Sequence, residues 1–178
     1  LHMEIVKERL EREFNLALIA TAPSVEYRVH KTNGEVQLVD TPMSLPPIQQ
    51  INFIEEPYFK VGIVTPKDYT GTLMELCQSR RGELQKIEYL SPERVELIYS
   101  IPLAEVVVDF FDQMKSRSQG YASLDYELEG YRESNLVRVD LLLNGQAADA
   151  FSTIVHRDRA FDYGDRKSTR LNSSHSSV

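Results

Sequence analysis

The stretch YFKVGIVTPKDYTGTLMELCQSRRG, residues 58–82, decides the fold, because a strand pattern passes within it into a helix pattern. YFKVGIVTP predicts a strand and TGTLMELCQSRRG predicts a helix. We expect Gly82 to supply the left-handed exit from this helix. Arg80 and Arg81 are expected in its last turn, where cations interact favourably with the negative end of the helix dipole.

The residues after Gly82 continue the alternation of strands and helices. The predicted elements are strands over 83–91 and 94–102, a helix over 103–120 and a strand over 121–131. In this helix Pro102 occupies the first-turn position, Gly120 ends the helix, and the apolar residues form one stripe. The order βαββαβ predicts the α+β class with a ferredoxin-like sandwich.

A different pattern precedes this unit. Residues 1–14, LHMEIVKERLEREF, predict an amphipathic helix that is already under way at the first residue, so we expect the chain to be a fragment. Val25, Tyr27 and Val29 then alternate before an Asn-Gly turn, which predicts a β-hairpin. Four prolines follow between residues 42 and 57 and indicate a domain boundary. The first unit is therefore expected to be part of a second α+β domain.

A β-rich segment follows the ferredoxin-like unit. Val137, Val139, Leu141 and Leu143 alternate, which predicts one strand, and an Asn144-Gly145 turn leads to a further apolar segment. Two strands and a turn cannot form an independent core, so this segment is expected to be truncated.

Composition limits the possible functions. The chain has 178 residues, 42% of them hydrophobic, and a formal net charge of −7, which argues against indiscriminate binding of polyanions. Its single cysteine, Cys77, leaves no cysteine cluster for zinc. His2, His30 and Cys77 are interpreted as structural, so neither a catalytic residue nor a metal site is predicted. The phosphate-loop pattern G-x-x-x-x-G-K-[ST] is missing from the sequence.

Four segments together resemble the elongation factor 4 (LepA) family of translational GTPases. They are LHMEIVKERLEREF (1–14), EPYFKVGIVTPKDYTGTLMELCQSRRG (56–82), IPLAEVVVDFFDQMKSRSQGYASLDYELEGYR (101–132) and VRVDLLLNGQAADAFSTIVHRD (137–158). The second segment is shared with elongation factor G and other ribosomal GTPases. Two stretches resemble elongation factor 4 in particular, GYASLDYELEGYR and LLLNGQAADAFSTIVHRD.

The resemblance covers about residues 1–159 and implies a domain organisation. Residues 1–55 would be the C-terminal part of domain III, residues 57–133 the equivalent of domain V of elongation factor G, and residues 136–160 the start of the family's C-terminal domain. The stretch 165–175, DRKSTRLNSSH, resembles a translated sequencing adapter. We therefore expect residues 165–178 to be a non-native, disordered appendage.

The resemblance also implies a function for the parent protein. The parent would be a GTP hydrolase with GTP and Mg²⁺ in a G domain outside this chain, and this non-catalytic part would hold no cofactor. Its expected partner is the ribosome, which it would contact through rRNA and tRNA, and DNA binding is not expected. The parent is expected to be a monomer. Its expected location is the cytoplasm, with peripheral association at the inner membrane left open, or the mitochondrial matrix or a plastid for an organellar form.

Seven side chains are predicted RNA contacts: His156, Arg157, Arg159, Arg80, Arg81, Lys115 and Arg117. The cluster HRDR, residues 156–159, can hold phosphates through charge-assisted hydrogen bonds or be a solvated cluster at a strand end. For the other four residues the interpretation as cations at helix ends is favoured, and a phosphate contact is compatible with it.

Two further interpretations are weighed against ribosome binding. The first is a free-standing ferredoxin-like module that binds RNA or regulates without catalysis. The paired aromatic platform of an RNA-recognition motif is missing from its strands, which argues against that type of RNA binding. The second is a small ferredoxin-like enzyme, and no nucleophile or acid/base pair in the sequence supports it.

Overall fold

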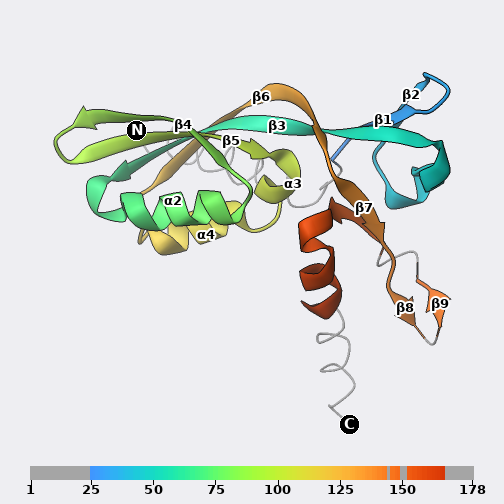
Figure 1. Cartoon of the computed structure of the whole chain (residues 1–178). Coiled ribbons are helices and arrows are strands. Elements are labelled where there is room, and N and C mark those ends of the chain that lie inside the picture. Colours follow the sequence, from blue (N-terminus) through green and yellow to red (C-terminus); the bar gives the residue numbers. More distant parts are fainter. Residues whose placement is uncertain (1–24, 144, 149–151, 167–178) are drawn as a thin grey trace, which may run out of the picture. The chain divides into compact units, whose positions relative to one another are not determined.

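The computed structural model describes residues 25–143, 145–148 and 152–166. They form two compact units, which are described separately (Figure 1). Unit 1 comprises Val25 and Pro57–Tyr131, and unit 2 comprises Glu26–Glu56 with residues 132–166. The helix predicted over residues 1–14 lies outside the described residues.

Unit 1 has the predicted βαββαβ order. Its elements are β3 (Ile51–Pro66), α2 (Thr70–Ser79), β4 (Glu83–Ser91), β5 (Arg94–Pro102), α3 (Leu103–Val106), α4 (Phe110–Arg117) and β6 (Ser123–Ser134). The first six residues of β3 and the last three of β6 belong to unit 2. The strands pair in the order β4-β5-β3-β6, and β5 is antiparallel to both β3 and β4. This strand order is that of a ferredoxin-like sandwich, so the predicted fold class is confirmed.

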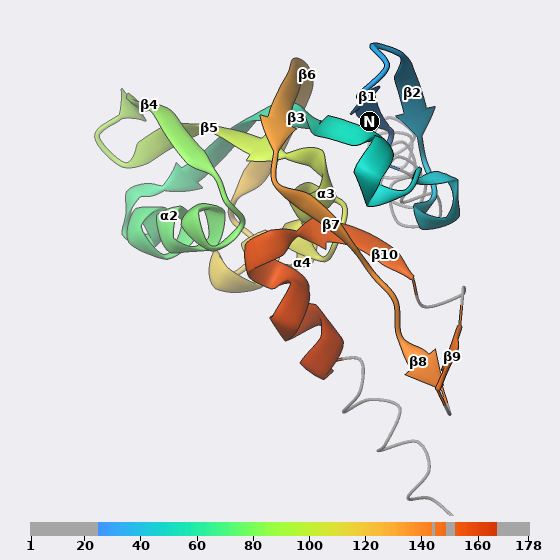
Figure 2. The ribbon, with the colours of Figure 1, turned by 45° about the vertical axis from the view of Figure 1, so that its right-hand side comes forward.

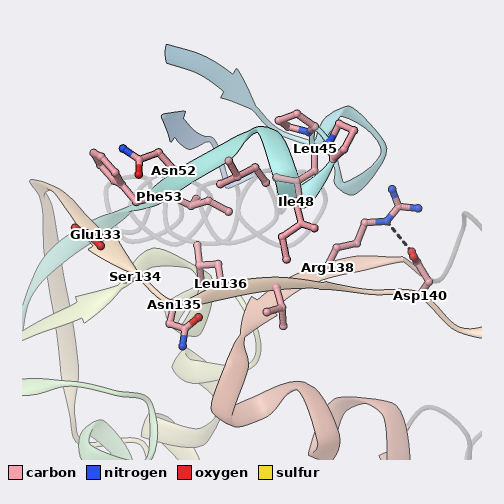
Figure 3. A pocket seen from close by; sticks show the side chains of 15 residues that line it. Leu45, Ile48, Asn52, Phe53, Glu133, Ser134, Asn135, Leu136, Arg138 and Asp140 are labelled. Atoms are coloured by element: carbon pink, nitrogen blue, oxygen red, sulfur yellow. Dashed lines mark hydrogen bonds and ion pairs between the residues drawn. The ribbon is translucent and has the colours of Figure 1, made fainter. Parts of the chain in front are cut away.

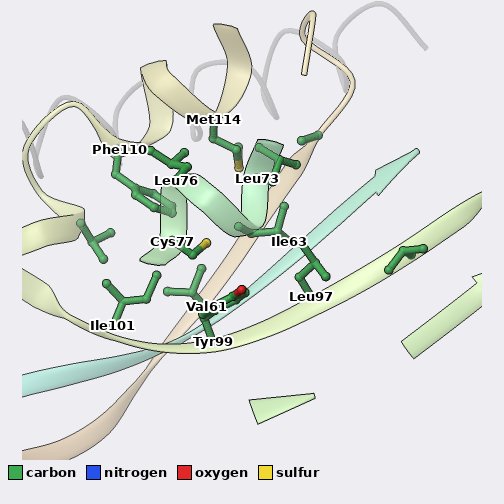
Figure 4. Packing of buried hydrophobic residues seen from close by; sticks show 13 residues of the cluster. Val61, Ile63, Leu73, Leu76, Cys77, Leu97, Tyr99, Ile101, Phe110 and Met114 are labelled. Atoms are coloured by element: carbon green, nitrogen blue, oxygen red, sulfur yellow. The ribbon is translucent and has the colours of Figure 1, made fainter. Parts of the chain in front are cut away.

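The core of unit 1 lies between this sheet and helices α2 and α4 (Figure 4). Val61 and Ile63 of β3 and Leu97 of β5 are fully buried because alternate residues of a strand face the same side of a sheet. Leu73 of α2 and Met114 of α4 cover them from the helical side. Each buried aliphatic side chain stabilises the fold by about 1.5–3 kcal/mol relative to an exposed one.

The helix predicted over 103–120 is divided into α3 and α4, which corrects the sequence-based prediction. Asp109 separates them with a left-handed backbone, φ 49°. The residues before it, Val106–Val108, are all β-branched and disfavour a continuous helix. Gly120, at φ 83°, follows the end of α4 as predicted, and its amide donates to the Lys115 carbonyl at 2.8 Å.

The end of α2 also differs from the prediction. The helix ends at Ser79 with Arg80 as the C-cap residue, so Arg80 and Arg81 lie just beyond its last turn. The left-handed residue is Arg81, at φ 57°, rather than Gly82. Gly82 is instead required by close packing, because a Cβ at this position would lie 2.6 Å from the carbonyl oxygen of Cys77.

The first part of unit 2 is the predicted hairpin. Strand β1 (Tyr27–Lys31) pairs antiparallel with β2 (Val36–Val39), and Gly34 in the turn has φ 87°. On its other edge β1 pairs with the first residues of β3, with Val29 opposite Ile54. The proline-rich connection between β2 and β3 contains two 3-10 turns, η1 (Pro42–Ser44) and η2 (Ile48–Gln50).

The strand predicted from Val137 to Leu143 is interrupted. Strand β7 (Leu136–Val139) pairs with β10 (Thr153–His156), whereas β8 (Leu142–Leu143) pairs with β9 (Gln146–Ala147) (Figure 2). Between β7 and β8 the Asp140 carboxylate accepts hydrogen bonds from Arg138 and Ser152, which holds the chain in a bend.

The last described residues follow β10 directly. The 3-10 turn η5 (Arg157–Arg159) leads into a helix over residues 160–166. Asp165 and Arg166, expected to be disordered, therefore belong to this helix, where Arg166 Nε donates to the Asp162 carbonyl at 3.2 Å. The remaining residues of the expected appendage, 167–178, lie outside the described part of the chain.

Candidate nucleic-acid interface

The seven predicted RNA contacts lie at three places in the structure. Arg80 and Arg81 follow α2, Lys115 and Arg117 lie in the last turn of α4, and His156, Arg157 and Arg159 lie at the junction of β10 and η5 in unit 2. The three groups differ in whether their positively charged side chains already have hydrogen-bond or ion-pair partners within the protein.

Arg80 holds the corner between α3 and α4. Its Nη1 donates to the carbonyl of Val108 at 2.9 Å and to that of Glu105 at 3.4 Å, and its Nη2 pairs with the carboxylate of Asp109. The Arg80 side chain is 16% exposed. Its guanidinium donors are therefore largely occupied inside unit 1, as the structural interpretation of this residue requires.

Arg81 is bound in a similar way. Its Nε lies 3.1 Å from Oε1 of Glu105, and the two side chains are 17% and 13% exposed. The left-handed backbone of Arg81 directs the chain from α2 into β4. Together, Arg80 and Arg81 connect the end of α2 to the α3–α4 corner.

The two cations of α4 differ from each other. Lys115 Nζ donates to the carbonyl of Ala122 at 2.5 Å and lies 5.6 Å from the centre of the Phe111 ring. Lys115 thus satisfies a carbonyl beyond the helix end, as a cation in a last helical turn often does. Arg117 makes neither a hydrogen bond nor an ion pair within the described residues, although it lies in the same turn.

A tyrosine pair that includes Tyr121, four residues after Arg117, was not predicted. The rings of Tyr69 and Tyr121 are stacked, with centroids 6.3 Å apart and planes 17° apart, and Tyr121 is 64% exposed. The sequence pattern had placed Tyr121 in the last strand of the unit, but β6 begins two residues later, at Ser123. An exposed Gly-Tyr after a helix end is only a weak sequence signal. The two tyrosines are 52 positions apart, so local pattern analysis does not reveal that they pair.

The HRDR cluster lies at a strand end. Nδ1 of His156 accepts a hydrogen bond from the Asp158 amide at 3.4 Å and lies 3.6 Å from the Asp158 carboxylate. The amide of Arg157 donates to the Asn135 carbonyl at 2.9 Å, which fixes the start of η5. The Arg157 side chain is exposed, with its guanidinium unbonded within the described residues, whereas Arg159 has a partner inside the protein.

A charged group borders β7 near this cluster. Arg138 Nε donates to Asp140 at 2.7 Å, and the Ser152 hydroxyl donates to the same carboxylate at 2.6 Å. The Ser152 hydrogen bond, followed by the one from Arg138, lowers the pKa of Asp140 from its usual 3.8. The negative charge of Asp140 thus largely neutralises Arg138, which is consequently a weaker site for phosphate than Arg157.

Unit 2 contains a pocket of about 1160 Å³ (Figure 3). Apolar side chains such as Ile48, Phe53 and Leu136 line it, and Arg138 and Asp140 lie at its edge as an ion pair. None of the seven predicted contacts is a lining residue. The pocket therefore does not unite the predicted cations into one site.

The remaining histidine and cysteine positions agree with their structural interpretation where they are described. His30 Nε2 lies 2.8 Å from Glu55 and the His30 ring stacks on Phe53, whereas Cys77 is buried in the core. His2 lies outside the described residues. Within the described part of the chain, three or more metal-ligating side chains do not come together, and the helices there are too short or too polar to cross a membrane.

The sequence is similar to several known proteins. The family model described as "Elongation factor G C-terminus" matches residues 53–142. "Elongation factor 4" of Synechococcus elongatus is 62% identical over 164 residues, which are 92% of this chain and 27% of that protein. "Elongation factor 4" of Gloeobacter violaceus is 57% identical over 171 residues, which are 96% of this chain and 28% of that protein.

The chain thus spans little more than a quarter of the length of these curated relatives. Among solved structures, the crystal structure of a Thermus thermophilus protein aligns with a TM-score of 0.42 and 22% identity, covering 46% of this chain and 12% of that one.

Proposed function

The chain belongs to the elongation factor G C-terminus family, and from this we propose that it is the ribosome-docking part of an elongation factor 4-type translational GTPase. The observation that carries the proposal is its identity of 57–62% with proteins named elongation factor 4 over more than nine-tenths of its length.

We assign the docking and the chemistry to different parts of the parent protein. The 178 residues contain no phosphate-loop motif, so GTP and Mg²⁺ would be held by a G domain outside them. Within the chain, we assign residues 1–55 to the end of domain III, residues 57–133 to the equivalent of domain V, and residues from 136 to the family's C-terminal domain. This chain would position the parent on the ribosome rather than hydrolyse GTP.

The contacts with RNA would come from cations that are free of internal partners. Arg157 and Arg117 meet this condition among the seven predicted residues, because their side chains are unbonded within the described part of the chain. A guanidinium with open donors can form two parallel hydrogen bonds to a phosphate. We assign Arg157 to tRNA or rRNA contact from the C-terminal domain, and Arg117 to rRNA contact from the domain V equivalent.

Two biological steps fit this docking role, back-translocation of a stalled ribosome and assembly of the small subunit. We propose that the parent acts where ribosomes are, in the cytoplasm or, for an organellar form, in the mitochondrial matrix or a plastid. In either step each unit would present a cation to the RNA backbone, Arg117 from unit 1 and Arg157 from unit 2.

Co-sedimentation with 70S ribosomes tests the proposal. The full-length gene product should pellet with ribosomes in the presence of a non-hydrolysable GTP analogue and much less so with GDP. Arg157→Gln should weaken the association and make it less sensitive to salt than that of the wild-type protein, since one phosphate contact is removed. Lys86→Gln, which removes an exposed cation already paired with Glu88, is the matched control.

Two results would contradict the proposal. An absence of nucleotide-dependent sedimentation would exclude a ribosomal GTPase. Ribosome binding that is equally strong with GDP, with the analogue and without nucleotide would favour the alternative of a free-standing ferredoxin-like RNA-binding module.

A further inference from the structure

One end of unit 1 gathers the tyrosine pair and several cations. Strand β3 ends there at Pro66, α2 begins after Tyr69, the β4–β5 turn spans residues 91–94, and α4 ends at Arg117 before Tyr121. Pro66 lies opposite Arg94 in the β3–β5 ladder, which brings these segments together. We call the residues 66–69, 91–94 and 115–121 the Tyr121 end.

The ring of Tyr121 is presented to solvent in a fixed orientation. The Tyr121 amide donates to the Ser118 carbonyl at 3.0 Å, which closes a tight turn after α4, and both central residues of this turn, Gln119 and Gly120, are left-handed, at φ 52° and φ 83°. Tyr69 stacks on one side of the Tyr121 ring, and 64% of the residue stays exposed. A ring held in this way can accept a planar aromatic group without losing much side-chain entropy on binding.

The charges at the Tyr121 end favour an anion. Its cations are Lys67, Arg94, Lys115 and Arg117, and its acids are Asp68 and Glu93. Lys67 pairs with Glu93 at 3.2 Å, whereas the side chains of Arg94 and Arg117 make no hydrogen bond or ion pair within the described residues. Every other lysine and arginine among the described residues of unit 1 has an internal partner, so the two guanidiniums without a partner in this part of the chain lie at the same end.

The opposite end of unit 1 lacks this combination. There Arg80 and Arg81 are bound by Asp109 and Glu105, and their guanidiniums face into the unit. The sheet also carries a second stacked pair, Phe59 and Tyr126, but Tyr126 is only 38% exposed, and the neighbouring cation Lys60 is paired with Glu127. Tyr89 on β4 is also an exposed ring, so what distinguishes Tyr121 among the described residues of unit 1 is that its exposed ring is fixed by stacking on Tyr69, at the end that carries Arg94 and Arg117.

We propose that the Tyr121 end binds an unpaired RNA nucleotide, with the base stacked on the ring of Tyr121 and a phosphate held by Arg117. Base–aromatic stacking accepts any base, and an adjacent guanidinium holds the backbone by charge-assisted hydrogen bonds. By themselves, the ring and the cations would suit any ligand that carries both an aromatic group and a negative charge. The choice of RNA as the partner therefore rests on the proposed function. Arg94 lies on the same end and adds attraction for the flanking phosphate.

The first experiment uses the full-length protein bound to 70S ribosomes with a non-hydrolysable GTP analogue. Ultraviolet irradiation should produce a nucleotide adduct on the peptide that contains Tyr121, detected by mass spectrometry. Tyr121→Leu should weaken ribosome binding roughly five- to hundredfold, the range expected for one base–aromatic stack. Tyr121→Phe keeps the ring and should retain the affinity within about twofold, and Tyr126→Leu is the matched control with an unaffected affinity.

The second experiment separates this inference from the proposed function. The 178-residue chain is titrated with a short single-stranded oligoadenylate that carries 2-aminopurine, whose fluorescence is quenched when the base stacks. Quenching should occur with the wild-type chain and with Tyr121→Phe, and should be lost with Tyr121→Leu and reduced with Arg117→Gln. Thermal unfolding of each variant shows whether the fold is kept, which the exposure of Tyr121 leads us to expect.

The outcomes assign failure to one proposal or the other. Nucleotide-dependent ribosome binding that Tyr121→Leu leaves unchanged, without an adduct at Tyr121, would overturn the nucleotide site and leave ribosome docking intact. A crosslink from Tyr121 to a ribosomal protein would also overturn it. Quenching that depends on Tyr121 without ribosome binding would support the nucleotide site and contradict the ribosomal function.

Discussion

A Cβ atom placed on Gly82 would lie 2.6 Å from the carbonyl oxygen of Cys77, the same oxygen that accepts a 2.9 Å hydrogen bond from the Gly82 amide. The end of α2 is thus closed by a contact between two backbones, which only glycine permits. The side chain of Ile101 on β5 would lie 3.2 Å from that Cβ and leaves no free direction for it. The contact explains why residue 82 is glycine although the left-handed residue beside it is Arg81.

Gly82→Ala should therefore lower the free energy of unfolding by about 1–3 kcal/mol, because the methyl group forces the backbone apart. Gly71→Ala is the matched control, since a Cβ at this position of α2 meets no atom within 4 Å. That substitution should stabilise the protein by roughly 0.5–1 kcal/mol through helix propensity. Urea denaturation of the two variants measures whether the free energy of unfolding falls for Gly82→Ala and rises for Gly71→Ala. The same change in both variants would contradict the packing argument.

Arg80 and Asp109 should be energetically coupled, because the guanidinium binds both the Asp109 carboxylate and the carbonyls of the α3–α4 corner. A double-mutant cycle with Arg80→Gln and Asp109→Asn should give a coupling of about 1 kcal/mol, with the partial exposure of Asp109 keeping it modest. Asn is chosen because it tolerates the left-handed conformation of residue 109. The exposed pair Lys86 and Glu88 should show a smaller coupling, and a larger one there would contradict this ranking.

Two buried groups should make the protein less stable in alkali. Burial raises the pKa of Cys77 from 9.0 to about 12, and burial together with Cys77 raises the pKa of Tyr99 from 10.0 to about 12. As pH rises above about 9, the unfolded chain loses these protons before the folded protein does, so the free energy of unfolding falls until pH reaches about 12.

Tyr99→Phe should reduce this alkaline loss. It should cost little stability at neutral pH, because the buried Tyr99 hydroxyl has no hydrogen-bond partner among the described residues. Denaturation curves between about pH 8 and 11 measure the slope. Tyr89→Phe on the exposed strand β4 is the control and should keep the wild-type slope. An equal slope in Tyr99→Phe would show that this hydroxyl does not titrate as argued.

The lowered pKa of Asp140 should depend on Ser152, whose hydrogen bond is the larger cause of the shift, ahead of Arg138. Ser152→Ala should raise the pKa of Asp140 toward 3.8 in a carboxyl-detected NMR titration. Because the folded pKa lies below the unfolded value, the stabilisation by this carboxylate is present above about pH 4 and is lost as pH falls. Ser134→Ala, which leaves the Asp140 carboxylate untouched, should not change the titration.

Sequence patterns predicted the positions of strands more reliably than the details at helix ends. The hairpin at Gly34 and the strand over YFKVGIVTP depend on neighbours along the chain, and the structure contains both. The break at Asp109 was missed, because it is held by Arg80, 29 residues earlier. The role of Gly82 was also misjudged, because a glycine required by close packing against the Cys77 carbonyl and Ile101 looks the same in a sequence as one required by its dihedral angle.

The candidate site, too, could be predicted only in part from the sequence. The sequence indicated which residues carry positive charge and which family the chain resembles, since both depend on residue identity and order alone. Only the tertiary structure decided which of these positively charged side chains have no partner within the described part of the protein. Arg80 and Arg117 are both arginines at the end of a helix, yet folding places a carboxylate beside the first and, among the described residues, none beside the second. Whether a cation is available to a partner depends on groups brought near by packing, and these lie far away in the sequence.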